Sequence, residues 1–353
     1  MKILVGMSGG VDSSVAAWLL KQSGYEVIGA TMDIWDEEFS SQLTAKNKGC
    51  FASDKSSIEL AKSVCQLLDI PHYVVDCRDE YKKKVLANFR EEYKAGRTPN
   101  PCIVCNSNIK FSVLPDSAKN QGIEFDKFAT GHYAQIFYNN SINRYQIKCG
   151  VDDKKDQSYF LYRLSQEQLK NIVLPLGEKN KQEIRLLAQQ AGLGICDKPD
   201  SQDFYGGKIN DILQFEARKG DFVDVNGHVL GKHDGYWNFT IGQRRGLGIS
   251  APKPLYVIDI NKDKNEVVLG YIEECQKKVL LARNWVWQSD VPHEKINCVA
   301  KIRSSQKFCD VEVTLIENDC YKVEFLVPQS AITAGQSVVL YDNNIILGGG
   351  IID

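Results

Sequence analysis

The six residues Ser8-Gly9-Gly10-Val11-Asp12-Ser13 decide how the N-terminal part of this chain folds. They follow a short apolar run, Ile3–Val5, and lead into Ser13–Ser23, where apolar residues recur at helical spacing. The order is therefore strand, glycine-rich turn and helix. Two glycines let the backbone bend tightly and approach a ligand closely. Because the start of the following helix offers unpaired N–H groups and a positive dipole end, the stretch predicts a phosphate-binding turn.

This turn differs from the common P-loop. It lacks the glycine-lysine-serine/threonine ending, so the run itself carries no lysine that could reach the outer phosphates of a nucleotide. Two hydroxyl groups and the Asp12 carboxylate stand there instead. The run SGGVDS resembles the pyrophosphate loop of the N-type ATP pyrophosphatases, which cleave ATP between its α and β phosphates. An ordinary glycine-rich turn is the alternative, and the match of all six residues favours the phosphate loop.

Length and composition bound the class of protein. The chain has 353 residues, of which 43% are hydrophobic and 25% charged, as is typical of a globular protein with two or three domains. No apolar run approaches the ~20 residues that span a bilayer, so we expect no membrane association. Met1–Gly6 is typical of a strand and not of a signal peptide. Eleven scattered cysteines predict reduced thiols in the cytoplasm. A net charge of −2 neither indicates nor excludes a nucleic-acid partner.

Residues 1 to about 200 alternate strand and helix patterns, which predicts a doubly wound parallel sheet. The predicted strands are Ile3–Val5, Val27–Met32, His72–Asp76 and Phe128–Gly131. The predicted helices are Ser13–Ser23, Ser56–Leu68, Glu80–Lys94, Ser112–Gln121, Gln166–Ile172 and Lys181–Ala191. Ligands bind at the carboxyl ends of the strands in such sheets. The first turn, the segment after Met32 and Thr130-Gly131-His132 are therefore expected to line one cleft.

The pattern changes after Pro199. Glycines become frequent and short β-like runs replace the helical patterns, first Phe222–Val225, Tyr256–Ile260 and Val267–Gly270. Five more such runs follow: Val279–Ala282, Val299–Ile302, Val311–Leu315, Lys322–Phe325 and Val338–Tyr341. Evenly spaced short strands suggest small barrels. We predict an α/β domain over 1–205, a small central β domain over 206–274 and a C-terminal β barrel over 275–353.

A second segment with chemical content is Gly96–Asn106, GRTPNPCIVCN, in which Cys102 and Cys105 form a C-x-x-C after two prolines. The prolines predict an extended chain ahead of the thiols. Half of a structural zinc site is one interpretation, but no second C-x-x-C or paired histidine and cysteine set completes it, so we expect no metal there. Two buried thiols are another. A reactive pair is favoured, because Lys94 and Arg97 would stabilise a thiolate or an approaching phosphate.

A series of motifs in one order resembles the bacterial tRNA-specific 2-thiouridylase family over essentially the whole chain. The motifs are SGGVDS, GRTPNPC-x-x-CN-x-x-IKF, ATGHYA, KKDQSYFLY, KPDSQDF, GQRRGLGI, QSAITAGQ and LGGGII. The resemblance implies an ATP pyrophosphatase domain, a central β domain and a C-terminal β barrel. It also implies ATP, Mg²⁺ and tRNA as ligands. Members adenylate the C2 oxygen of the wobble uridine, and a persulfide sulfur then displaces AMP to leave 2-thiouridine.

The resemblance also implies roles for individual residues. The ATP phosphates would be held by Gly6, Met7, Ser8, Gly9, Gly10, Val11, Asp12 and Ser13, with Asp12 helping to place Mg²⁺. Met32 would border the adenine, and Gly131 would lie against the nucleotide. Cys105 matches the family's first catalytic cysteine. The target base would lie at Asn100, Pro101 and Cys102.

Contacts to tRNA are implied at two further places, Lys155-Asp156-Gln157 and the pair Arg303-Ser304 in the C-terminal barrel. For Lys155 and Arg303, an ordinary solvated surface charge is the alternative. We assign His132 no catalytic role.

One departure from the family affects the sulfur chemistry. Members carry a second catalytic cysteine in a run like DSQ-x-x-CF, and here Tyr205 stands at that position. A phenol cannot hold a persulfide. Cys196 could swing in, Cys102 could work with Cys105, or the sulfur could arrive as free sulfide or on an iron–sulfur cluster. A cluster normally needs three protein thiols and this pair supplies two. The pair of Cys102 and Cys105 is favoured, and a paralogue with altered or lost thiolation is the alternative.

Two other classes of function compete with tRNA thiolation. Synthetases with the same ATP loop act on small molecules, but they have no need of the C-x-x-C or of the C-terminal motifs. A non-catalytic RNA-binding module leaves SGGVDS unexplained. The thiolation hypothesis requires a persulfide-donating sulfur carrier or a cysteine desulfurase as a partner.

Overall fold

The computed structural model describes residues 1–34, 55–196, 198, 204–205, 207–292 and 294–353. They form two compact units. The first unit holds residues 1–86, 101–208 and 343–347, and the second holds residues 87–100, 209–342 and 348–353. Both regions for which the sequence predicts separate β domains fall mainly in the second unit, so the division into three domains stays a prediction. Within the described residues, no helix is long and apolar enough to cross a membrane.

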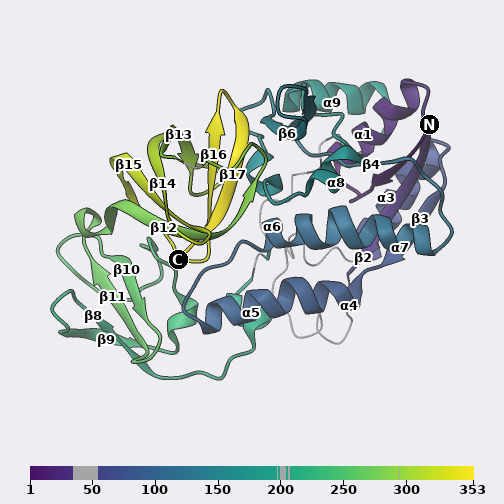
Figure 1. The fold of residues 1–353 in the computed structure, drawn as a ribbon. Coiled ribbons are helices and arrows are strands. Elements are labelled where there is room, and N and C mark those ends of the chain that lie inside the picture. The colour runs from purple at the N-terminus through teal and green to yellow at the C-terminus, as the bar shows by residue number, and fades with distance from the viewer. Residues whose placement is uncertain (35–54, 197, 199–203, 206, 293) are drawn as a thin grey trace. The chain divides into compact units, whose positions relative to one another are not determined.

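A five-stranded parallel sheet forms the centre of the first unit (Figure 1). Its strands lie in the order β3-β2-β1-β4-β7. They are β1 (Lys2–Gly6), β2 (Glu26–Asp33), β3 (His72–Asp76), β4 (Lys127–Ala129) and β7 (Ile172–Val173), and each pairs with its neighbour in parallel. The chain runs outward from β1 to β3 and then returns to β4 on the other side of β1. The doubly wound sheet is confirmed, and its topological switch point lies between β1 and β4.

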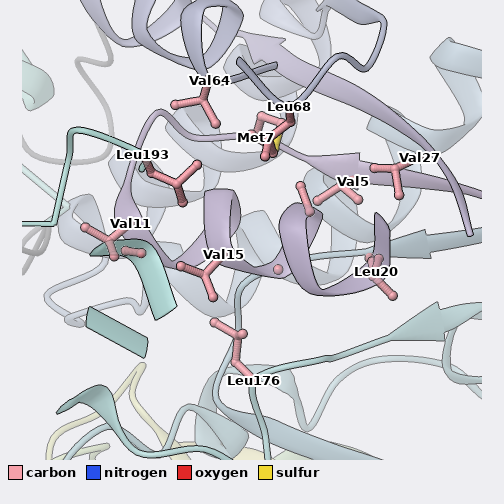
Figure 2. Close-up of a cluster of buried hydrophobic side chains, with 14 of the residues drawn as sticks. Val5, Met7, Val11, Val15, Leu20, Val27, Val64, Leu68, Leu176 and Leu193 are labelled. Atoms are coloured by element: carbon pink, nitrogen blue, oxygen red, sulfur yellow. The ribbon is translucent and has the colours of Figure 1, made fainter. Parts of the chain in front are cut away.

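Helices cover this sheet and hold its first strand in the core. Among the described residues, the helices of the first unit are α1 (Val11–Gln22), α3 (Lys55–Leu67), α4 (Arg78–Tyr81), η1 (Lys82–Leu86), α6 (Pro101–Cys105), η2 (Asn106–Val113), α7 (Leu114–Asn120), η3 (Ser158–Leu161), α8 (Gln166–Lys170) and α9 (Lys181–Gln190). Figure 2 shows Val11 and Val15 of α1 in one cluster with Val5 of β1, Val64 of α3 and Leu193. Each such side chain contributes about 1.5–3 kcal/mol when fully buried. This core fixes the start of α1 against the end of β1.

Several predicted elements differ from the structure in their bounds or type. The sequence predicts an extended chain before Cys102, but Pro101 begins α6, and helical turns continue through η2 to Asn120 at the end of α7. Proline suits the first helical position, because its fixed φ matches the helix and its missing N–H is not needed there. The predicted helix Gln166–Ile172 ends at Lys170, since Ile172 already belongs to β7.

A β-hairpin that the sequence patterns did not indicate also belongs to the first unit. It consists of β5 (Ala134–Asn139) and β6 (Arg144–Cys149), which pair in antiparallel fashion. Ile345, the first residue of β17 (Ile345–Ile352), pairs with Lys148 of β6.

The second unit contains two β structures. A four-stranded sheet has the order β10-β11-β8-β9 and consists of β8 (Gly220–Val223), β9 (Val229–His233), β10 (Tyr256–Asn261) and β11 (Glu266–Gly270). A barrel follows with β12 (Gln276–Trp287), β13 (Ile296–Lys301), β14 (Cys309–Glu317), β15 (Cys320–Ser330), β16 (Ser337–Asp342) and β17. Its order is β12-β15-β14-β13-β16-β17, and β12 also pairs with β17, so the predicted C-terminal barrel is confirmed. The helical elements are α5 (Ala87–Lys94), α10 (Ile209–Leu213), η4 (Tyr236–Asn238) and η5 (Ile272–Cys275).

Candidate active site

The glycine-rich turn has the geometry of a phosphate site. Gly9 has φ +67°, and a Cβ there would lie 2.6 Å from the carbonyl oxygen of Ser57, so only glycine fits. Gly10 is the residue before α1, and no described side chain caps this helix start. The Ser8 N–H donates to Ser13 Oγ at 3.2 Å, which folds the turn back onto the helix. The first N–H groups of α1 are therefore placed to receive an anion.

The loop after β4 packs against this turn, as the sequence predicts. The strand ends at Ala129, two residues earlier than predicted, which puts Thr130-Gly131-His132 at the carboxyl end of the sheet. A Cβ on Gly131 would lie 2.6 Å from the backbone carbon of Asp12 and from the nitrogen of Ser13. The glycine thus allows the two backbones to touch. Both segments flank the switch point between β1 and β4, where ligands bind in sheets of this kind.

The carboxyl end of β2 is tied to the same turn. The N–H of Met7 donates to the carbonyl oxygen of Ala30 at 2.7 Å, and the hydroxyl of Thr31 donates to the carbonyl oxygen of Met7 at 2.9 Å. Met32 follows and is half-buried. Its contact with adenine stays a prediction. Residues 35–54, which continue this segment, lie outside the described residues.

Asp12 is held by two side chains to which the sequence analysis assigned no role. The ammonium group of Lys181 donates to Asp12 Oδ1 at 2.8 Å and to Oδ2 at 2.9 Å. The hydroxyl of Tyr133 donates to Asp12 Oδ1 at 2.6 Å. The Lys181 side chain is 11% exposed and the Asp12 side chain 30% exposed. The turn itself contains no lysine, but the fold brings one to it from α9.

A second lysine also reaches the turn. Lys198 Nζ donates to the carbonyl oxygen of Gly9 at 2.9 Å. Lys198 belongs to the KPDSQDF motif, most of which lies outside the described residues. The sequence did contain a signal for Lys181, because Asn180 and Glu183 form a capping box that marks a helix start. A cation in the first turn of a helix opposes the helix dipole, so a lysine there calls for an anionic partner.

The segment Asp152–Gln157 braces both groups that hold Asp12. The Asp152 carboxylate accepts the backbone N–H of Lys181 at 2.9 Å. Gln157 accepts the N–H of Tyr133 through Oε1 at 3.0 Å and donates its own N–H to the Tyr133 carbonyl oxygen at 2.9 Å. Asp156 accepts the N–H groups of Gly150 and Ser158 and the Ser158 hydroxyl. Contacts of Lys155, Asp156 and Gln157 with tRNA stay predictions.

His132 is a packing residue in this structure. It is 8% exposed, and its Nδ1 lies 2.7 Å from the Thr130 hydroxyl. Burial lowers the pKa of the His132 ring well below its usual value, and the charge of Lys110 adds to this effect, so the ring is neutral.

Cys102 and Cys105 lie one helical turn apart on α6 and so share one face of that helix. Both are partly exposed, and both are thiols. Cys77, which follows β3, lies close enough for the charge of Cys105 to affect it. Burial, with the charges of Asp76 and Cys105, raises the pKa of Cys77 to about 12. Burial alone raises the pKa of Cys65 to about 12. The buried thiols are therefore inert at neutral pH, whereas Cys102 and Cys105 are partly exposed.

The alternative second thiol, Cys196, is less well placed. It is partly exposed, as Cys102 and Cys105 are, but it packs against the hydrophobic cluster of the first unit, and its carbonyl oxygen accepts Arg185 Nη1 at 2.8 Å. Tyr205 is half-buried, but most of the run before it lies outside the described residues. Among the residues that the structure describes, no group of three or more histidine, cysteine, aspartate or glutamate side chains could hold a metal ion.

The remaining predicted residues lie in or beside the second unit. Asn100 follows Thr98 and Pro99, whose carbonyl oxygens accept Gln336 Nε2 at 2.8 and 3.1 Å. Arg97, predicted to stabilise a thiolate, instead forms a two-bond pair with Glu92 at 2.7 and 2.6 Å.

In the loop after β13, Arg303 is exposed and donates to the carbonyl oxygen of Ser330 at 3.1 Å, with Ser304 beside it. Of the predicted site residues, the structure thus brings the glycine-rich turn and Gly131 together. It also brings Lys181, which was not predicted, to the turn. Contacts of Arg303 and Ser304 with tRNA stay predictions.

Comparisons with known proteins extend over the whole chain. The family described as tRNA methyl transferase HUP domain matches residues 1–205, the tRNA methyl transferase PRC-barrel domain matches 208–271, and the aminomethyltransferase beta-barrel domain matches 277–352. The tRNA-specific 2-thiouridylase MnmA of Endomicrobium trichonymphae is 51% identical over 355 residues, covering 100% of this chain and 99% of that protein. The protein of the same name from Clostridioides difficile (strain 630) is 44% identical over 360 residues, covering 100% of this chain and 98% of that protein.

Proposed function

Because the chain belongs to the tRNA-specific 2-thiouridylase family, we propose that it is a tRNA-uridine 2-sulfurtransferase. It cleaves ATP to AMP and pyrophosphate and replaces the C2 oxygen of the wobble uridine with sulfur. One observation carries the proposal: the first unit holds both a phosphate-binding turn at the switch point of its sheet and a partly exposed pair of thiols. Activation needs the phosphate-binding turn and sulfur transfer needs the thiols. A synthetase that acts on small molecules needs only the turn.

The activation step uses the turn. The C2 oxygen of uridine attacks the α-phosphorus of ATP, the bond from that phosphorus to the bridging oxygen breaks, and pyrophosphate leaves with the electron pair. Gly6 through Ser13 and the start of α1 would bind the phosphates, because their N–H groups stabilise the charge that develops. Met32 and Gly131 would lie against the adenosine. A magnesium ion, which neutralises phosphate charge when bound, would be held by the part-exposed Asp12 carboxylate.

Sulfur transfer uses the C-x-x-C. A persulfide on Cys105 attacks C2 through its outer sulfur, and AMP leaves with the electron pair of the C2–O bond. The thiolate of Cys102 then attacks the Cys105 sulfur. The S–S bond to the base breaks, 2-thiouridine is released, and Cys102 and Cys105 form a disulfide that an external thiol reduces. Two helical residues three positions apart have Cα atoms ~5 Å apart, within the usual range for a disulfide. In this scheme Cys102 is the second catalytic thiol, a role that Tyr205 cannot fill because it has no sulfur.

The partners follow from this scheme. Asn100, Pro101 and Cys102 would lie at the flipped target base, since the base must leave its stack to react. Lys155-Asp156-Gln157 and Arg303-Ser304 would contact the tRNA backbone. A persulfide-donating carrier or a cysteine desulfurase would load Cys105, and the reaction would take place in the cytoplasm, where thiols stay reduced. A cluster that carries sulfide is the less favoured route, because the pair supplies two ligands where a cluster normally takes three.

Reconstitution tests the proposal. The purified chain is incubated with unmodified tRNA, ATP and a persulfide donor, and the nucleosides and nucleotides are then separated and identified by mass spectrometry. We expect 2-thiouridine together with AMP and pyrophosphate, all dependent on tRNA. Cleavage to AMP that is equally fast without tRNA would favour a small-molecule synthetase. A methylated nucleoside, or ADP with phosphate, would contradict the proposal.

A further inference from the structure

The phosphate-binding turn has no lysine of its own, and yet it is adjacent to a buried one. Lys181 is the first residue of α9, and it is separated from Asp12 by most of the first unit's sequence. Its Nζ lies within 2.9 Å of both carboxylate oxygens of Asp12. Asp12 in turn lies in the first turn of α1, where the free N–H groups point. The ammonium group therefore stands beside the place where phosphates would bind.

The position of Lys181 is fixed by contacts that do not involve its charge. Its backbone N–H donates to Asp152, and the capping box of Asn180 and Glu183 sets the start of α9. Its side chain is 11% exposed. A lysine at this site opposes the dipole of its own helix and loses most of its hydration. A structural role alone would be filled as well by a polar side chain that donates to Asp12.

We propose that Lys181 supplies the cation that binds the β and γ phosphates of ATP and the pyrophosphate leaving group. The proposal rests on the function proposed above. Asp12 holds the ammonium group while the site is empty, and the flexible four-carbon stem of lysine lets Nζ turn from the carboxylate to a phosphate oxygen. Asp12 keeps the Tyr133 hydroxyl as a donor at 2.6 Å when this happens. Lys181 thus takes the part of the lysine that an ordinary P-loop carries within its own sequence.

The negative charge that develops on pyrophosphate during the reaction explains why a cation is needed here. When the uridine oxygen attacks the α-phosphorus, the departing pyrophosphate takes the electron pair of the broken P–O bond. A cation that contacts this group stabilises the transition state more than the ground state, because the negative charge on the leaving group grows as the bond breaks. A lysine that only held Asp12 in place would affect the binding of pyrophosphate and of AMP equally.

Binding measurements on variants separate these two roles. Lys181→Met removes the charge, Lys181→Gln keeps a donor for Asp12 without charge, and Lys181→Arg keeps the charge. Lys170→Met, at an exposed residue of α8, is the matched control. Calorimetry gives the Kd for pyrophosphate and for AMP, and thermal melting reports the fold. We expect the Met and Gln variants to bind pyrophosphate about tenfold or more weakly, with the Kd for AMP unchanged.

The Arg variant should regain part of the pyrophosphate affinity, and Lys170→Met should match the wild type. An unchanged Kd for pyrophosphate in the Gln variant would overturn the inference, as would equal losses for pyrophosphate and AMP. Wild-type chain that binds no pyrophosphate would overturn both this inference and the phosphate-turn assignment. Wild-type chain that binds pyrophosphate through Lys181 but does not thiolate tRNA would overturn the proposed function alone.

Discussion

Gln157 and Tyr133 bind each other twice: the N–H of Gln157 donates to the Tyr133 carbonyl oxygen, and Gln157 Oε1 accepts the N–H of Tyr133. Tyr133 then donates its hydroxyl to Asp12 at 2.6 Å. Tyr133 therefore links the segment proposed to contact tRNA to the phosphate-binding turn through hydrogen bonds. The segment proposed to bind tRNA and the turn proposed to bind ATP belong to one local hydrogen-bonded structure.

This relationship predicts the effect of Gln157→Ala. The change leaves the buried Tyr133 N–H without its side-chain acceptor, which costs about 1–3 kcal/mol in stability. Tyr133 is then less well held, so tRNA-dependent formation of AMP should fall several-fold. Steady-state kinetics and thermal melting measure both effects. Gln190→Ala, at an exposed residue of α9, serves as the control and should match the wild type. Full activity in Gln157→Ala would show that Tyr133 does not depend on this contact.

Asp12→Ala should abolish the cleavage of ATP to AMP and pyrophosphate. The substitution removes the carboxylate that we propose for magnesium and leaves the Lys181 ammonium without its two acceptors. Asp12→Asn retains one acceptor oxygen, which Lys181 and Tyr133 can share as they share Oδ1 of Asp12, so it should restore part of the melting temperature while remaining inactive. Chromatography of the nucleotides provides the measurement. Substantial AMP formation by Asp12→Asn would count against a role for the negative charge.

We predict that Cys102 replaces the second catalytic cysteine of the family, at whose position this chain has Tyr205. Cys102→Ser should reduce 2-thiouridine formation about as much as Cys105→Ala, because both sulfurs are needed for release of the product. Cys196→Ser should reduce it little, since Cys196 packs against the core. Mild oxidation should join Cys102 to Cys105, which peptide mapping without reductant detects. If Cys196→Ser is the inactive variant instead, the second thiol lies elsewhere in the chain.

Alkylation should follow the thiol pKa values. Burial and nearby negative charge raise the pKa of Cys77 to about 12, and burial with the charge of Asp342 raises that of Cys298 to about 12. The thiolate is the reactive form, and its fraction is very small far below the pKa, so these two should resist iodoacetamide near neutral pH. Cys102 and Cys105 should react before these two, because their side chains are partly exposed. Mass spectrometry of the labelled peptides provides the test, and early labelling of Cys77 would contradict it.

Lys155→Ala and Arg303→Ala should each weaken tRNA binding and reduce the salt slope of log K by about one counterion. Affinity for ATP should not change. Lys119→Ala, an exposed lysine on α7, is the matched control and should leave the slope unaltered. Filter binding over a range of salt concentrations measures the slope. An unchanged slope in either variant would identify that residue as solvated surface.

The sequence predicted the parallel sheet and the barrel because apolar periodicity is a local property, as in Ile3–Val5 and Val11–Leu20. It also predicted that Gly131 lies near the turn, since strand ends of a doubly wound sheet meet at one edge. It missed Lys181 because only the packing of α9 brings this residue to Asp12, and no spacing in the chain records that distance. It also misjudged Pro101, which suits a helix start as well as an extended chain.

The most direct test of the account compares pyrophosphate release and 2-thiouridine formation in Cys105→Ala. The wild-type chain, supplied with tRNA, ATP and a persulfide donor, should form both products. Cys105→Ala should still release pyrophosphate and form adenylated tRNA when tRNA is present, because activation precedes sulfur transfer, but it should form no 2-thiouridine. Normal amounts of 2-thiouridine from Cys105→Ala would contradict the central claim that this thiol carries the sulfur to the activated base.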